Sequence, residues 1–339
     1  MKKSSRVWFS DRSPQTTVEE EEETLATEPP PSEVITMEIE ERGEEEVDKD
    51  EEFPKERLKT LAMTGLLFVA AILNQIVLSY IHERRPLTPP LPDLIFDTVP
   101  AFDGGLKICE VIMISLSSFT LVLIAFHRHR WIVFRRLMTI GSLLYLLRCV
   151  TLVVTQLPVA DEQFKCVPKL EENATIVGVT TRGWKHLYSL GLNFNKSSDN
   201  LCGDYLYSGH TIVLTITALF IAEYTPLAVW LLHWIAWTAA TSGMALLIVS
   251  RGHYTIDVIV SYFLSTRIFW NYHTMAAHPN TRNSAHNHHR KEFWFPVFYV
   301  LENKIHTSIP YEFDFPLPSS VKTAIRRKVL PRIEALFHE

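Results

Sequence analysis

The chain has 339 residues, of which 47% are hydrophobic and 21% are charged, and its formal net charge is −5. Its apolar residues are bunched into long runs instead of being spread along the chain, which indicates a polytopic membrane protein and excludes an ordinary soluble domain. No nucleic-acid partner is expected.

Residues 1–57 differ in composition from the rest of the chain. They hold 19 acidic and 8 basic residues and few apolar ones, which is typical of a disordered segment. We predict a disordered cytosolic tail that contacts cytosolic partners of unknown identity. Its net charge of −11 leaves +6 for the remaining residues, so the membrane part is mildly basic, as suits contact with phosphates.

Six apolar runs follow the tail, and a helix needs roughly 20 residues to cross the hydrocarbon core. The weakest run is the fourth, which must recruit residues 206–210 to reach that length. We therefore predict an all-α bundle of about six transmembrane helices within residues 58–275. The runs cover residues 60–81, 106–126, 137–157, 211–222, 227–249 and 254–272.

Basic residues predict the orientation of these spans, because short cytosolic loops are enriched in Lys and Arg. Arg84 and Arg85, after the first span, oppose the prediction, but the other short loops outweigh them. Both termini are expected in the cytosol. The residues that support this are Lys55, Arg57 and Lys59 before the first span, and His127, Arg128, His129, Arg130, Arg135 and Arg136 between the second and third.

The long connection at residues 158–207 is then lumenal or exoplasmic. It holds two glycosylation acceptors, Asn173 and Asn195, whose clustering supports this topology. It also holds Cys166 and Cys202. Either these two cysteines form a disulfide, or Cys202 serves the adjacent site.

Residues 276–339 are predicted to form a cytosolic juxtamembrane tail. Its histidines lack metal-ligand spacing, so a solvated segment is favoured over a metal site. The aromatic residues at 293–295 and 298–299 follow Arg290 and Lys291, which is typical of an interfacial anchor. The histidines are His278, His286, His288 and His289.

Polar residues inside spans are costly and need a reason. In the third span Tyr145, Arg148, Thr151 and Thr155 share one helical face. Arg148 lies about nine residues, or roughly 13 Å, from the lumenal end of that span. It is paired with a carboxylate on another helix, or it binds a phosphate in a cavity, and we favour the second reading.

Two histidine motifs flank predicted spans at this same lumenal face. His253 and Asp257 are spaced by one helical turn, so the carboxylate can fix the tautomer of the imidazole and make it a nucleophile. A buried pair that only satisfies itself is the alternative. His210 ends Ser208-Gly209-His210, where amides at a helix start can face an anion and the imidazole can protonate a leaving alkoxide.

The pairing of these two motifs resembles the lipid phosphate phosphatase superfamily, and longer blocks resemble the sphingomyelin synthase family. The chain departs from the phosphatases because Arg251 stands two residues before His253, not six, and their upstream KxxxxxxRP block is missing. Arg148, and Arg251 second, are therefore the candidates for the phosphate clamp. The blocks are Pro90-Leu91-Pro92-Asp93, residues 135–158, residues 202–211, residues 253–273 and the FDFPLP-like stretch at 313–318.

The resemblance implies a phosphatidylcholine:ceramide cholinephosphotransferase without a metal or another cofactor. His253 would be the nucleophile, Asp257 its partner and His210 the acid and base. A ceramide phosphoethanolamine synthase or a lipid phosphate hydrolase with the same site is the alternative, and a scaffold or transporter is disfavoured. The expected compartment is the Golgi or plasma membrane, and a homo-oligomer stays open. Substrate-binding residues are expected to be Tyr145, Arg148, Asp204, Ser208 and Arg251.

Overall fold

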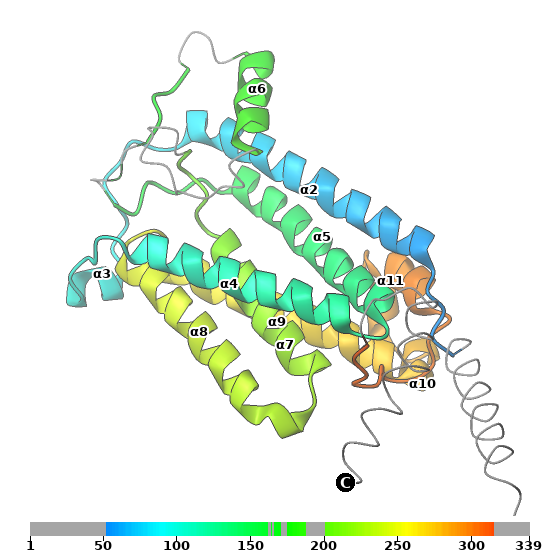
Figure 1. Cartoon of the computed structure of the whole chain (residues 1–339). Coiled ribbons are helices and arrows are strands. Elements are labelled where there is room, and N and C mark those ends of the chain that lie inside the picture. Colours follow the sequence, from blue (N-terminus) through cyan, green and yellow to red (C-terminus); the bar gives the residue numbers. More distant parts are fainter. Residues whose placement is uncertain (1–51, 162–163, 165, 171–174, 188–200, 315–339) are drawn as a thin grey trace, which may run out of the picture. The chain divides into compact units, whose positions relative to one another are not determined.

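The computed structural model describes residues 52–161, 164, 166–170, 175–187 and 201–314. Most of the predicted acidic tail and both glycosylation acceptors lie outside these residues. Extended pairing in the described part is limited to an isolated antiparallel bridge between His127 and Phe313. The helices, shown in Figure 1, are α2 (Arg57–Arg84), α3 (Leu94–Thr98), α4 (Gly105–Phe126), α5 (Arg130–Val154), α6 (Ile176–Leu187), α7 (Gly209–Tyr224), η2 (Leu227–Val229), α8 (Trp230–Val249), α9 (Thr255–Ala277), α10 (Pro279–Asn283), η3 (His288–Lys291) and α11 (Phe295–Glu302).

Four helical segments are long and apolar enough to cross a bilayer, namely α2, α4, α5 and the continuous stretch Leu227–Val249. The protein is thus an integral membrane protein. α7 is apolar, but its 16 residues extend about 24 Å, less than the roughly 30 Å of a hydrocarbon core. α9 has 23 residues, but polar side chains such as Asp257 and Arg267 interrupt its apolar sequence. The expected all-helical membrane fold is confirmed, with four long apolar helices and a shorter one.

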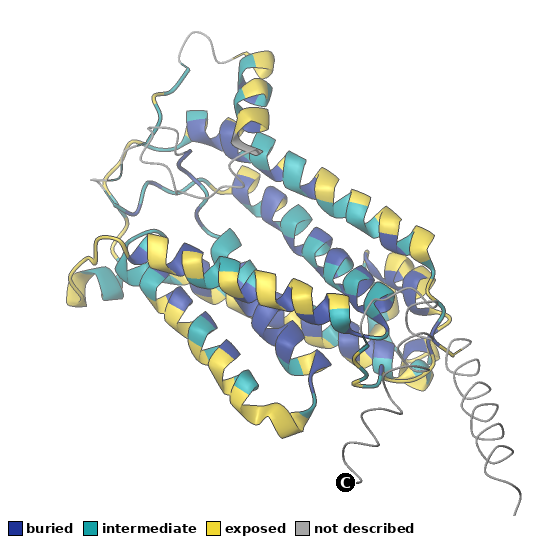
Figure 2. Cartoon of the chain, viewed as in Figure 1, coloured by how far each residue is buried: buried dark blue, intermediate teal, exposed yellow. Residues whose placement is uncertain are grey.

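The short apolar helix α7 fits this fold because other helices surround it. It packs against α4, α8 and α9. Leu214, Ala218 and Ile221 belong to one buried cluster, and Ile212 and Phe220 belong to another. A helix that is hydrophobic on all sides is expected in an interior. Exposed residues lie instead along the outer sides of α4 and α8 (Figure 2).

The third predicted span begins earlier than the sequence suggested. α5 starts at Arg130 instead of residue 137, so Arg135 and Arg136 lie inside the helix and not in a loop. Both are buried, and each has a carboxylate partner. Nη2 of Arg136 lies 2.7 Å from Oε2 of Glu302, and Nη1 of Arg135 lies 3.1 Å from Oε2 of Glu56. These ion pairs make the burial of the two guanidinium groups tolerable.

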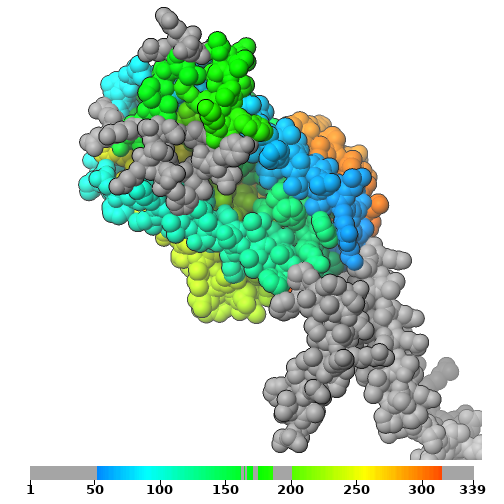
Figure 3. All heavy atoms as spheres, turned by 45° about the horizontal axis from the view of Figure 1, so that its top comes forward, coloured from blue at the N-terminus to red at the C-terminus, as the bar shows by residue number. Residues whose placement is uncertain are grey.

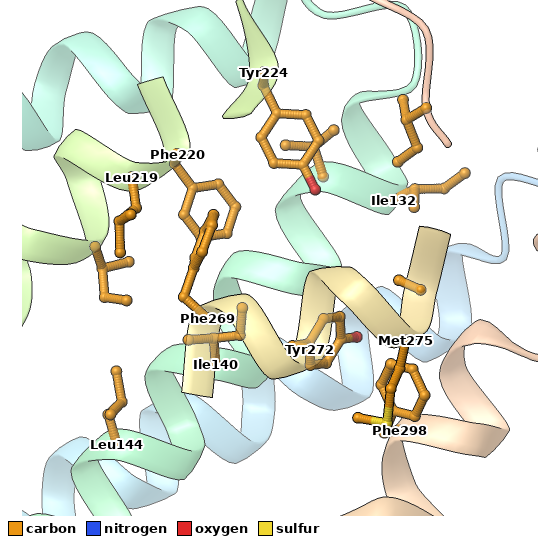
Figure 4. Packing of buried hydrophobic residues seen from close by; sticks show 14 of the residues in the cluster. Ile132, Ile140, Leu144, Leu219, Phe220, Tyr224, Phe269, Tyr272, Met275 and Phe298 are labelled. Carbon is orange, nitrogen blue, oxygen red and sulfur yellow. The ribbon is translucent and has the colours of Figure 1, made fainter. Parts of the chain in front are cut away.

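Residues 294–309 fold back onto the bundle, whereas the histidines that were predicted to be solvated, His278, His286 and His288, are exposed. Figure 4 shows Phe298 of α11 beside Tyr272 of α9, and their ring centroids are 4.8 Å apart. Trp294 and Phe295 are also buried, whereas Phe293 is 80% exposed. Part of the aromatic stretch that was expected to anchor the tail at the interface is therefore hydrophobic core.

The predicted lumenal connection contains a disulfide and a helix. Cys166 and Cys202 are bonded to each other, which decides between the two readings of the sequence. α6 was not predicted. It packs on α2, where Glu83 accepts a hydrogen bond from Arg182, and Figure 3 shows this green helix against the blue α2 at the molecular surface.

Candidate active site

The first histidine motif forms the start of α7. Ser208 is the N-cap, and its hydroxyl accepts a hydrogen bond of 3.3 Å from the backbone N–H of Thr211. The N–H of Ser208 donates to Oγ of Ser261 in α9 at 2.7 Å, which joins the two helices. Gly209 and His210 are the first residues of α7, so the imidazole projects from the first turn. Ser is a preferred N-cap residue because its hydroxyl satisfies an unpaired amide.

The second motif lies in the turn between α8 and α9. Arg251 has a φ of 55°, in the left-handed region, and this sharp turn reverses the chain between the two helices. His253 precedes the N-cap residue Tyr254, so it lies outside α9 and not one turn before Asp257 within a helix, as the spacing suggested. The contact between the two side chains nevertheless forms, with Nδ1 of His253 3.3 Å from Oδ2 of Asp257.

Asp257 has three partners, which explains why it is fixed in place. Its Oδ2 also accepts a 3.0 Å hydrogen bond from the N–H of Tyr254, as part of a capping box. Its Oδ1 accepts a 2.8 Å hydrogen bond from the N–H of Leu206, in the segment that leads to His210. A carboxylate near a helix N-terminus is stabilised by the helix dipole. Asp257 therefore links the two histidine motifs through the backbone as well as orienting His253.

The two imidazoles face each other across a cavity of about 290 Å³, and their ring centroids are 6.1 Å apart. Of the predicted substrate-binding residues, Tyr145, Arg148, Asp204 and Arg251 line this cavity together with both histidines. Ser208 is not among the lining residues. It is buried as the N-cap of α7, and its role in substrate binding stays a prediction.

Arg148 forms part of the cavity wall, where three acceptors fix it. Its Nε donates to the carbonyl of Tyr207 at 2.8 Å, and its Nη2 donates to Oδ2 of Asp204 at 3.1 Å. The third acceptor is Oδ1 of Asn74 in α2. The first reading of Arg148 is confirmed in part, because this residue is paired with a carboxylate. Arg148 also lines the cavity, and its binding of a phosphate stays a prediction. The carboxylate comes from a loop and not from another helix.

Asp204 is charged at neutral pH in this environment. Burial opposes its charge, but the nearby His253, Arg148 and His210 together lower the pKa of its carboxyl group. Its side chain is 28% exposed. Asp204 thus brings negative charge to a wall that otherwise carries cationic or protonatable groups.

Sequence reasoning missed two polar residues inside apolar runs. Glu110 of α4 is fully buried, and its Oε1 lies 3.8 Å from Nε2 of His210. Asn74 of α2 is buried and holds Arg148. Both runs were treated as apolar throughout, although a carboxylate or an amide at membrane depth is itself a signal of function.

Known proteins match this chain over most of its length. A protein-family model described as PAP2 superfamily C-terminal matches residues 201–274. Phosphatidylcholine:ceramide cholinephosphotransferase 1 of Caenorhabditis elegans is 50% identical over 303 residues, which cover 89% of this chain and 64% of that protein. Phosphatidylcholine:ceramide cholinephosphotransferase 2 of Mus musculus is 38% identical over 291 residues, which cover 83% of this chain and 78% of that protein.

The chain belongs to the phosphatidylcholine:ceramide cholinephosphotransferase family. It spans 64% of the length of the Caenorhabditis elegans relative, and also 64% of the enzyme numbered 1 from Gallus gallus, to which it is 38% identical. The PAP2 match includes His210, His253 and Asp257. Arg148 of α5 and Glu110 of α4 lie outside the matched residues.

Proposed function

We propose that the protein transfers phosphocholine from phosphatidylcholine to the primary hydroxyl of ceramide, giving sphingomyelin and diacylglycerol. The observation that carries this proposal is the pair of imidazoles at one cavity, with ring centroids 6.1 Å apart and with Oδ2 of Asp257 3.3 Å from Nδ1 of His253. The names of the relatives supply the two lipid substrates.

In the first step His253 attacks phosphorus. Its Nδ1 faces Asp257, so Nε2 is the nitrogen left to act as the nucleophile. The new N–P bond forms as the bond from phosphorus to the diacylglycerol oxygen breaks. His210 gives its proton to that oxygen, and the products are diacylglycerol and a phosphocholine group on His253. Oε1 of Glu110 lies 3.8 Å from Nε2 of His210, so a carboxylate stands beside the proposed acid.

In the second step ceramide replaces the leaving group. His210, now neutral, takes the proton of the primary hydroxyl, and the resulting oxygen attacks the same phosphorus. The N–P bond breaks, sphingomyelin forms, and both histidines return to their starting protonation states. Neither step consumes a nucleotide, because one phosphodiester is exchanged for another.

Arg148 supports both steps by electrostatic stabilisation. Its guanidinium lies against Gly209, where a Cβ would be 3.5 Å from Cζ of Arg148, so its charge stands beside the N-terminus of α7. A fixed cation and a helix N-terminus together favour a phosphate that gains negative charge. The three acceptors of Arg148 hold it in place before substrate binds, which reduces the reorganisation needed during the reaction.

The cavity wall also suits lipid substrates. Apolar side chains from α2 and α4 line it, namely Leu78, Leu106, Met113 and Ile114. Such a wall admits acyl chains from the side and disfavours water, the competing acceptor. For the choline group, Tyr205 offers an aromatic face at the cavity, with its ring centroid 5.9 Å from that of His253.

The topology belongs to the same proposal. α7 and α9 complete six crossings, both termini are cytosolic, and the two histidines lie at the lumenal or exoplasmic face of the Golgi or plasma membrane. The clustering of basic residues near the start of α2 and between α4 and α5, at the opposite ends of these helices from the histidines, supports this orientation.

A donor competition assay tests the function. Purified protein receives fluorescent ceramide and equal amounts of phosphatidylcholine and phosphatidylethanolamine, and the expected product is fluorescent sphingomyelin. Ceramide phosphoethanolamine as the main product would support the alternative synthase. Rapid release of choline phosphate without ceramide would identify a hydrolase. A protein that forms none of these products under conditions where a curated relative is active would contradict the enzymatic proposal.

A further inference from the structure

His253 lies outside α9, in the turn that precedes this helix. The residue precedes the N-cap of α9, and Nδ1 of its side chain lies 3.3 Å from Oδ2 of Asp257. A displacement of the 251–255 turn would therefore move the nucleophile relative to phosphorus. A shift of about 1 Å in reacting atoms can cost a hundredfold in rate.

Residues 91–96, between α2 and α4, contact this turn, and Asp93 makes the central contacts. Its Oδ2 accepts a 2.8 Å hydrogen bond from the backbone N–H of Thr255, and its Oδ1 accepts a 2.8 Å hydrogen bond from the hydroxyl of the same residue. Oδ1 also accepts from the N–H of Ile95, in the first turn of α3. One carboxylate thus joins the start of α3 to the start of α9.

The neighbours of Asp93 reinforce the contact on either side of His253. The N–H of Leu91 donates to the hydroxyl of Tyr254 at 3.0 Å. The ring of Phe96 stacks on Tyr254 with centroids 5.6 Å apart, and its carbonyl accepts a 3.3 Å hydrogen bond from Arg251. The residues before and after His253 are therefore both tied to the 91–96 segment.

We propose that Asp93 is a positioning residue that fixes the 251–255 turn, and through it the nucleophilic nitrogen of His253. This inference rests on the proposed function for its kinetic consequence, but the contact itself does not depend on it. The carboxylate suits this task better than an amide, because it accepts all three hydrogen bonds at once. Three such bonds also hold the pKa of Asp93 below its usual range despite its burial.

The kinetic test compares Asp93→Ala, Asp93→Asn and a control, Asp97→Ala, which removes an exposed carboxylate one turn further along in α3. Rapid-quench labelling with headgroup-labelled phosphatidylcholine, without ceramide, gives a rate constant and an amplitude for the intermediate on His253. For Asp93→Ala we expect the rate constant to fall on the order of ten- to hundredfold with an unchanged amplitude. Asp93→Asn, which keeps one acceptor oxygen, should fall between it and the wild type, and Asp97→Ala should match the wild type.

The amplitude of labelling distinguishes a residue that positions His253 from one that only stabilises the fold. A carboxylate that only stabilises the fold would lower the amplitude, the fraction of competent enzyme, and leave the rate constant of the remainder unchanged. That result would overturn the proposal, as would a wild-type rate constant in Asp93→Ala. Thr255→Val is a milder variant that keeps the backbone N–H and removes only the hydroxyl donor, and it should slow labelling severalfold.

Hydrogen exchange tests the contact without an activity assay. Amides of residues 250–258 should exchange at least about tenfold faster in Asp93→Ala than in Asp97→Ala, because the turn loses its anchor. If the wild type forms no labelled intermediate, the proposed mechanism fails, and the exchange rates alone then decide whether Asp93 holds the turn. Unchanged exchange in Asp93→Ala would refute the inference in either case.

Discussion

Asp257 holds His253 from within a helix cap: Oδ2 of Asp257 accepts from the N–H of Tyr254 at 3.0 Å and lies 3.3 Å from Nδ1 of His253. The same carboxylate therefore fixes the start of α9 and the tautomer of the imidazole next to it. A carboxylate that orients a catalytic histidine is worth a large rate factor because the wrong tautomer cannot react.

His253→Ala and Asp257→Asn should affect catalysis differently. His253→Ala removes the nucleophile, so we expect no covalent intermediate in rapid-quench labelling. Asp257→Asn leaves the nucleophile in place but gives Nδ1 a partner that favours the wrong tautomer, so transfer should fall on the order of 10³- to 10⁴-fold. Covalent label that persists in His253→Ala would show that another residue is the nucleophile.

His210 should be needed only when the leaving group needs a proton. With phosphatidylcholine, His210→Ala should slow intermediate formation on the order of 10²- to 10⁴-fold. With a nitrophenyl ester of phosphocholine, whose leaving group departs as a stable anion, the same variant should label His253 at close to the wild-type rate. Equal losses with both donors would mean that His210 binds the phosphate and is not the acid.

The disulfide between Cys166 and Cys202 should stabilise the wall of the cavity. It closes a sequence separation of 36 residues, which corresponds to about 4 kcal/mol in the chain-entropy account. Cys202 also lines the cavity two residues before Asp204. A reductant should lower the unfolding midpoint and the activity of the wild type and have no such effect on Cys166→Ser/Cys202→Ser. An equal effect of the reductant on both proteins would place the sensitive bond elsewhere.

That the histidine motifs lie at one cavity was predictable because each motif is short and local in the sequence. His210, His253 and Asp257 needed only the assignment of both motifs to one end of the bundle. The helical spacing of His253 and Asp257 led to the right pair for the wrong reason, since a capping box and not a helical turn brings them together. Arg148 stood out because it shares one helical face with Tyr145, Thr151 and Thr155.

Residues whose partners are distant in the sequence were not predictable. Glu302, the carboxylate partner of Arg136, lies 166 positions further along the sequence. The residues near Arg136 in the sequence therefore did not indicate that this cation is buried inside α5. Glu110 and Asn74 were missed because the runs were recognised by their overall apolar composition, and one polar residue among many apolar ones changes that composition little. The aromatic residues near 295 have the composition of an interfacial anchor, and only packing against α9 decides that several are core.

His127 should make the stability of the protein fall at mildly acidic pH. It lies between α4 and α5, where burial first and the neighbouring His129 second lower its pKa to about 4, with Glu312 opposing. Between pH 6.5 and about 4, His127 is protonated in the unfolded chain but neutral in the folded protein. Stability is therefore lost as the pH falls through this window. Its Nδ1 also accepts a 3.1 Å hydrogen bond from the N–H of His129, which protonation would break.

The measurement is the unfolding midpoint of detergent-solubilised protein between pH 7 and pH 4.5. His127→Gln keeps a side chain that accepts the His129 hydrogen bond but does not titrate, so its midpoint should fall less than that of the wild type. His286→Gln, an exposed histidine, is the control and should behave like the wild type. Parallel curves for all three proteins would mean that His127 is not the group responsible.

The buried ion pair between Arg136 and Glu302 should contribute strongly when only one partner is removed. Glu302 is fully buried, and its carboxylate also accepts a 3.0 Å hydrogen bond from the hydroxyl of Tyr272. Glu302→Gln leaves the guanidinium of Arg136 without a counter-charge, at an expected cost of about 3–5 kcal/mol in unfolding free energy. Arg136→Met combined with Glu302→Leu replaces both charges and should recover most of that loss. Denaturant titration of the two variants measures the difference, and a double variant as unstable as Glu302→Gln would show that the hydrogen bonds, not the charge pairing, hold α11 on the bundle.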